Sequence, residues 1–177
     1  PPANAPNVIA VGGVDDQNML GETAHRLYHS SYGTTVDGLM KPELVAHSIW
    51  IAAPILPNSP EQRESEILHR LLQLRDSDLM NEAKKDFSKT KLDSTNFDTD
   101  RPDLIRQKIL TRIRTCKYIS PHYMHVDGTS FASPIVTAVI AQLLQIDHSL
   151  SPGNIREILF STSKRINDLP AERQGFG

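Results

Sequence analysis

A serine between a short polar turn and a long apolar segment is the residue best suited to covalent chemistry. Ser130 follows Gly128 and Thr129 and precedes an apolar run that reaches Leu144. The run predicts a helix that is apolar around its whole circumference, and such a helix is buried on all sides. Unpaired first-turn N–H groups and the helix dipole favour negative charge at this end. The pattern therefore predicts a rigidly held hydroxyl suited to acyl transfer, with simple helix capping by the serine as the alternative.

The string from Gly128 to Pro134 reads Gly-Thr-Ser-Phe-Ala-Ser-Pro. It resembles the nucleophile motif Gly-Thr-Ser-x-Ala-x-Pro of the subtilisin-like serine proteases (subtilases, peptidase S8 family). The resemblance implies that Ser130 is the acylated nucleophile and that its backbone N–H is an oxyanion-hole donor. It also implies that Thr129 supports that hole and, with Gly128, shapes the turn.

Three further segments are similar to the same family. Residues 2–15 resemble its Pro-Ala-rich loop and Val-Ile-Ala-Val-Gly-Ala strand, residues 29–33 its Phe-Ser-Ser-x-Gly turn, and residues 41–46 its Lys-Pro-Asp-Val-Val-Ala strand. Residues 8–13 form a short β-branched run closed by glycines, which is typical of a strand in a parallel sheet. The resemblance implies an α/β fold. Residues 1–177 would be the C-terminal half of a subtilisin-like, three-layer peptidase domain with a mainly parallel sheet and a central buried helix.

The resemblance breaks after residue 46, where the family usually has Pro-Gly and this chain has His47-Ser48. A histidine at this place could be a ligand or a base. His47 has no partner motif, however, so a residue of an ordinary turn is the favoured interpretation. The departure affects the expected shape of the turn and leaves the expected fold unchanged.

A helical insertion is expected at about 56–116, after a strand at 49–54. Ser59 and Pro60 begin an amphipathic helix, and a second helix begins at residues 100–103. The polar stretch from Asp76 to Asp100 predicts an irregular loop. The insertion is interpreted either as a solvated hairpin on the flank of the domain or as a lid over the leaving-group side, since it returns just before the nucleophile turn.

A serine nucleophile needs a base and usually an acid that orients the base. In the family these residues lie in Asp-Thr/Ser-Gly and His-Gly-Thr, with an oxyanion-hole asparagine in Ala-Ala-Gly-Asn. None of the 7 histidines is followed by Gly-Thr, and the acidic motif is absent from the sequence. His125 lies too close to Ser130 in sequence to place its ring beside the hydroxyl easily.

The resemblance therefore implies a serine endopeptidase subunit or fragment that acts on protein or peptide substrates through an acyl-enzyme. The His and Asp would come from a segment or chain upstream of Pro1, the N-terminal half of the domain, and this chain alone is expected to be inactive. The alternative is a non-catalytic pseudoprotease or peptide-binding scaffold.

Composition limits the remaining possibilities. The formal net charge of −2 gives no reason to expect a nucleic acid or an anionic membrane as a partner. A single cysteine, Cys116, excludes an internal disulfide and a cysteine-based metal site. The chain has no unbroken run of about 18 apolar residues, so no membrane span is expected. Neither a metal nor another cofactor is expected, and the compartment stays open between secreted and cytoplasmic.

Overall fold

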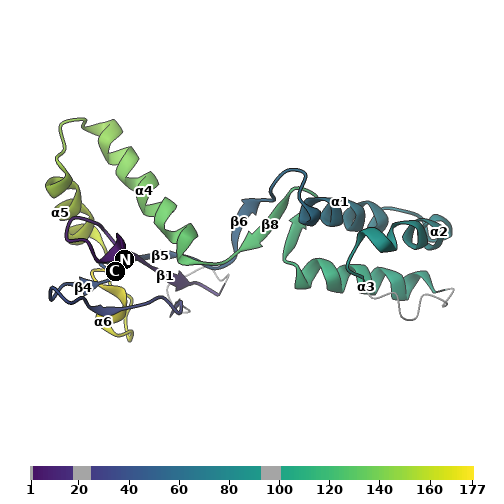
Figure 1. Cartoon of the computed structure of the whole chain (residues 1–177), viewed down its shortest axis with the longest axis horizontal. Helices are drawn as coiled ribbons and strands as arrows, with labels where there is room; N and C mark the ends of the chain where they lie inside the picture. Colours follow the sequence, from purple (N-terminus) through teal and green to yellow (C-terminus); the bar gives the residue numbers. More distant parts are fainter. Residues whose placement is uncertain (1, 18–24, 93–100) are drawn as a thin grey trace. The chain divides into compact units, whose positions relative to one another are not determined.

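The chain forms two compact units (Figure 1). The computed structural model describes residues 2–17, 25–92 and 101–177. The first unit consists of Pro1–Ile51 and Val126–Gly177, and the second of Ala52–His125. The second unit is therefore inserted into the first, and it contains the whole of the expected insertion at 56–116.

The first unit is built on a three-stranded sheet. Strand β1 (Val11–Asp15) is its middle strand, parallel to β5 (Leu44–His47) and antiparallel to β2 (Arg26–Leu27). The three central residues of β1 are buried. The strands expected at 8–13 and 41–46 form as β1 and β5, each beginning three residues later than expected, and they pair in parallel; the mixed α/β class is confirmed.

A short hairpin and a short helical turn complete the first half of this unit. Strands β3 (Gly33–Thr34) and β4 (Met40–Lys41) form a two-stranded antiparallel sheet. The turn η1 (Pro2–Asn4) precedes β1. These elements lie within the stretch that precedes β5.

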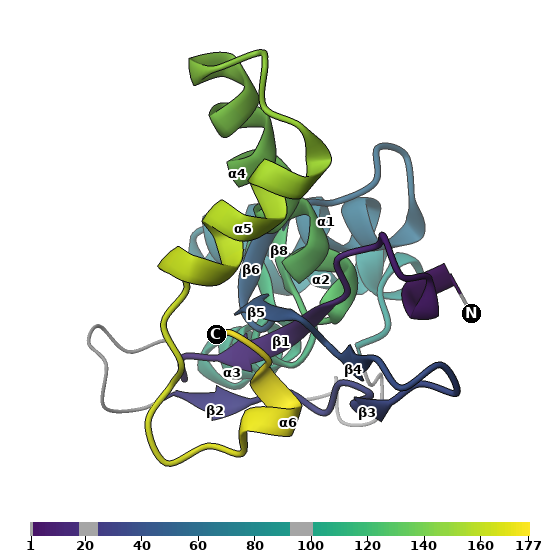
Figure 2. The same ribbon diagram turned by 90° about the vertical axis from the view of Figure 1, so that its left-hand side faces the viewer.

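Two helices cover one side of β1 and β5, α4 (Thr129–Ile146) and α5 (Pro152–Thr162), as Figure 2 shows. Ser151 caps α5 in a capping box, as its sequence predicts. The buried core joins one strand to both helices through Leu44, Val136, Ile155 and Leu159.

The C-terminal residues lie along the outer edge of β5. The short helix α6 (Ala171–Gln174) precedes Gly175, whose φ of 64° is in the left-handed region. The N–H of Phe176 donates to the carbonyl of Glu43 at 2.9 Å, and the N–H of Val45 donates to the carbonyl of Gly177 at 3.0 Å. A Cβ on Gly175 would lie 2.3 Å from the Glu43 carbonyl oxygen, so only glycine fits this approach.

Helix α4 is not enclosed by the described residues, which corrects the prediction of a helix buried on all sides. Only Ala132 and Val136 of this helix are buried. Large apolar side chains stay exposed along it: Ile135, Val139, Leu144 and Ile146. The helix is apolar on every side, but the sheet and α5 contact only one of them.

Helix α4 is also long and apolar enough to cross a membrane by length and composition. No membrane span is expected from the sequence, because Thr137 and Gln142 interrupt the apolar run. The core helix of a soluble protein satisfies the same criterion. Val136, Ile140 and Leu143 pack against β5 and α5, and one helix of this kind is weak evidence for a membrane span.

The second unit has a small sheet with three helices. Its sheet has the order β6-β8-β7, and its elements are β6 (Ile51–Pro54), α1 (Pro60–Leu72), α2 (Asp76–Asp86), η3 (Phe87–Lys89), α3 (Pro102–Thr115), β7 (Tyr118–Ser120) and β8 (Tyr123–Val126). Ser59 caps α1 by accepting a hydrogen bond from the N–H of Gln62. Both helices predicted for the insertion are therefore confirmed.

Helix α2 contradicts the irregular loop predicted for residues 76–100. Leu79 and Ala83 lie one turn apart on this helix and are fully buried. Asp86 accepts from both Arg70 and Lys89 at its C-terminal end. Apolar residues at this spacing were masked by the many charged neighbours. Residues 93–100 of the predicted loop lie outside the described residues.

Glu64 is a buried carboxylate that joins four segments of the second unit. Arg112 of α3 donates to both of its oxygens at 3.0 Å, and Tyr118 of β7 donates at 3.1 Å. The N–H of Lys91 donates at 2.8 Å. Burial acts most strongly and raises the pKa of Glu64, but together these hydrogen bonds and the Arg112 charge hold the pKa below its ordinary value.

We expect residues 52–125, produced alone, to fold as a cooperative unit. Their core is formed by Ile55, Leu68, Leu71, Leu79, Ala83, Ile105, Ile109 and Tyr118, all within this range. The two ends of the piece lie in neighbouring strands, which suits an autonomous inserted domain. A single sigmoidal thermal transition by circular dichroism would support this. A gradual, non-cooperative melt would show that the unit needs the rest of the chain.

Glu64→Gln should lower the free energy of unfolding of this unit by about 2 kcal/mol, because it removes a charge-assisted contact to a largely buried guanidinium. The lowered pKa means that the carboxylate stabilises the fold above its unfolded-state pKa and that this contribution is lost as pH falls through the folded pKa. Urea titrations between pH 3 and 7 would test both points. Glu82→Gln, which breaks a surface pair with Lys85, is the matched control and should have a small effect.

Candidate active site

Ser130 lies exposed in the first turn of α4. The N-cap of the helix is Gly128, with φ 142° and ψ 152°, so Ser130 is the second helical residue. The interpretation of Ser130 as only a capping residue is therefore wrong, because a different residue holds that position. The turn needs a backbone angle that L side chains rarely adopt, which explains glycine two residues before the serine.

Polar groups gather at the first turn of α4, where Ser130 lies. In the described part of its own unit, no side chain forms a hydrogen bond with the Ser130 hydroxyl. The N–H groups of Thr129 and Ser130 lie in the first turn, where a helix provides no internal acceptor. The next N–H, that of Phe131, donates to the Gly128 carbonyl at 3.0 Å. An exposed hydroxyl beside such donors is the arrangement that oxyanion stabilisation requires.

Two hydrogen bonds hold the residues before Ser130 in place. The N–H of Gly128 donates to the Ser48 carbonyl at 2.7 Å. The N–H of Trp50 donates to Oδ1 of Asp127 at 3.0 Å. No sequence motif singles out Ser48, Trp50 or Asp127, although the departure at His47-Ser48 lies in the segment that carries two of them.

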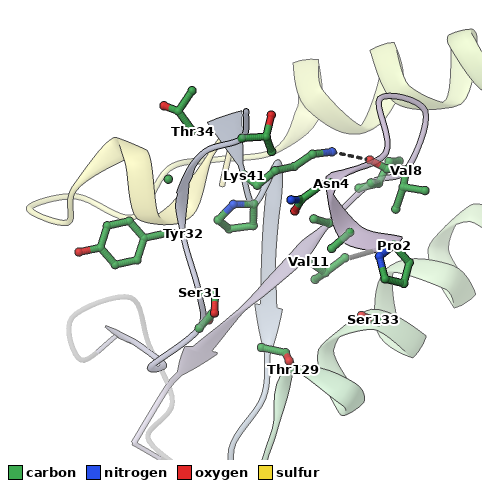
Figure 3. A pocket seen from close by; sticks show the side chains of 17 residues that line it. Pro2, Asn4, Val8, Val11, Ser31, Tyr32, Thr34, Lys41, Thr129 and Ser133 are labelled. Carbon is green, nitrogen blue, oxygen red and sulfur yellow. Dashed lines mark hydrogen bonds between the residues drawn. The ribbon is translucent and has the colours of Figure 1, made fainter. Parts of the chain in front are cut away.

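A hollow of about 520 Å³ opens beside the first turns of α4 (Figure 3). Thr129 and Ser133 of α4 line it together with residues of η1, β1 and the β3–β4 hairpin. Lys41 also lines it, but its ammonium donates to the carbonyl of Val8 at 2.8 Å and to the carboxylate of Glu43. The Lys41 ammonium is therefore already paired within the fold. The remaining lining of the hollow consists mainly of small, neutral groups.

The histidines with described surroundings do not form a catalytic pair with Ser130. His47 Nδ1 lies 3.6 Å from the Asp16 carboxylate, and its ring centroid lies 6.1 Å from that of His25. His47 is the last residue of β5 and pairs with Val14 of β1, so it lies in a strand and not in the ordinary turn that was expected. His125 belongs to strand β8, where its N–H donates to the Lys117 carbonyl at 2.8 Å.

Metal-binding chemistry finds no support in the described ranges. Among these residues, no group of three or more histidine, cysteine, aspartate or glutamate side chains is arranged to hold a metal ion. Cys116 of the second unit is partly buried, and burial raises the pKa of its thiol. This thiol therefore does not favour the thiolate that metal binding requires.

The chain is thus an α/β protein with an exposed serine in the first turn of an apolar helix. The family model described as the subtilase family, peptidase S8, matches residues 1–177. The chain belongs to the subtilase family of serine peptidases, which confirms the resemblance found in the motifs. Searches of curated proteins and of solved structures gave no match.

Gly128→Ala should lower the free energy of unfolding of the first unit by about 1–3 kcal/mol. A Cβ at this position has space, with its nearest neighbour at 3.7 Å, so the cost arises from the φ of 142°. Gly153→Ala is the matched control, because Gly153 lies in the first turn of α5 without a positive φ and its nearest neighbour is also at 3.7 Å. Equal urea midpoints for the two variants would show that the turn does not depend on the glycine.

Proposed function

We propose that the chain is the part of a serine endopeptidase that carries the nucleophile Ser130. The observation that carries the proposal is the exposed hydroxyl in the first turn of α4, within a motif of the subtilase family. The substrate is a protein or peptide. Membership in the family supports peptide-bond hydrolysis, and the position of the serine supports its role as the attacking group.

In the proposed reaction, Ser130 Oγ attacks the scissile carbonyl carbon while a base takes the hydroxyl proton. The carbonyl electrons move onto its oxygen, and the Ser130 N–H donates a hydrogen bond to that oxyanion, with Thr129 as support. The C–N bond then breaks, and the leaving amine takes the proton from the base. Water attacks the resulting acyl-enzyme ester, which releases the acid product and restores the hydroxyl.

The base and its orienting acid are proposed to come from the N-terminal half of the domain, in the same precursor or on a separate chain. The family order is Asp, His, Ser, which places both partners before the serine. The unpaired Ser130 hydroxyl among the described residues of its unit supports this arrangement.

The exposed side of α4 is the proposed docking surface for that half. Ile135, Val139 and Leu144 are exposed on a helix that is apolar on every side. Burial of apolar surface drives association, and patches of this kind mark interaction sites. The same surface would suit a non-catalytic peptide-binding scaffold, which remains the second candidate.

A fluorophosphonate probe tests the proposal. We expect labelling of the chain when the upstream half is present, loss of labelling in Ser130→Ala, and no labelling of this chain alone, because a serine without its base loses most of its reactivity. Ser133→Ala is the matched control, because Ser133 lies one turn further along the same helix. Absence of labelling with the upstream half present would favour the scaffold.

A further inference from the structure

The nucleophile turn is joined to the sheet by a short chain of contacts through Ser48. This residue is fully buried, and its N–H and Oγ both donate to the carbonyl of Val14 in β1, at 3.0 and 3.2 Å. Its own carbonyl accepts the N–H of Gly128 at 2.7 Å. The position of the residue two places before Ser130 is therefore fixed from β1 through Ser48.

A second contact lies beside the first, between Trp50 and Asp127. These residues adjoin the two strands that connect to the second unit, since β6 begins at Ile51 and β8 ends at Val126. Trp50 has a φ of 58°, a conformation that a tryptophan keeps only where its surroundings impose it. Its N–H donates to Asp127 Oδ1 at 3.0 Å.

Together these contacts form a clamp, defined as Ser48, Trp50, Asp127 and Gly128. The clamp joins residues 48–50, which lead into the inserted unit, to residues 127–128, which follow it. It closes directly before Thr129 and Ser130, so the chain that returns from the insertion is fixed before it reaches the nucleophile.

We propose that Asp127 is a positioning residue for the nucleophile. Its carboxylate accepts the Trp50 N–H, completes the clamp and holds Ser130 at the attack geometry next to the point where the inserted unit joins the chain. The proposal rests on the proposed function of Ser130. Displacement of a catalytic group by about 1 Å can cost roughly 100-fold in rate. Loss of the clamp should therefore lower the rate of acylation and leave substrate binding almost unchanged.

The test compares Asp127→Ala, Asp127→Asn and wild type in the protein assembled with its upstream half. We expect Asp127→Ala to lower kcat and the rate constant of fluorophosphonate labelling by roughly 10- to 100-fold with KM little changed. Asp127→Asn should restore most of the loss, because its amide oxygen can accept the Trp50 N–H. Asp147→Ala is the matched control, since Asp147 accepts the N–H of Ser149 at the other end of α4.

Amide hydrogen exchange of Gly128 and Trp50 gives a readout that does not depend on activity. Faster exchange at both amides in Asp127→Ala, with exchange as slow as in wild type in Asp127→Asn, would support the clamp. This holds even if the wild-type protein is not labelled by the probe. Absence of wild-type labelling would count against the proposed function only. Wild-type labelling together with unchanged kcat and unchanged exchange in Asp127→Ala would overturn the positioning role.

Discussion

The packing of α4 onto the parallel pair β1 and β5 is the constraint on which the position of Ser130 depends. Val136 meets Leu44 and the two buried residues of α5 in one apolar cluster. This contact fixes the direction of the helix axis, and with it the direction in which the first-turn N–H groups point. The orientation of Ser130 and of the first-turn N–H groups is thus set by apolar packing at Val136, several residues further along the helix.

Sequence patterns were sufficient where local chemistry decides the structure. The β-branched run at 8–13, the serine caps at 59 and 151, and the nucleophile motif each specify an element by short-range rules. Helix α2 escaped this reasoning because its two fully buried residues, Leu79 and Ala83, are surrounded by charges whose pairing with Arg70 and Lys89 is set by the tertiary fold.

The same distinction between local rules and tertiary interactions applies to the residues of the candidate site. The motif indicates Ser130 and Gly128, since a left-handed turn before a helix requires particular residue types. Ser48 and Trp50 contact this turn through backbone groups, which nearly every residue type provides, and the Asp127 carboxylate accepts a backbone N–H from 77 residues away in the sequence. Whether other segments enclose α4 could not be predicted from the sequence either. The apolar pattern shows which faces of the helix can be buried, but it does not show which segments pack against them.

The replacement of the usual Pro-Gly by His47-Ser48 has a consequence for strand β1. A Cβ on Gly13 would lie 2.3 Å from Ser48 Oγ and 2.7 Å from the Cβ of Tyr28, so the serine side chain fills the space that an alanine would need. Ser48 and Tyr28 together therefore make glycine obligatory at 13, so the segment next to the Ser130 turn restricts which substitutions the centre of the sheet can accept.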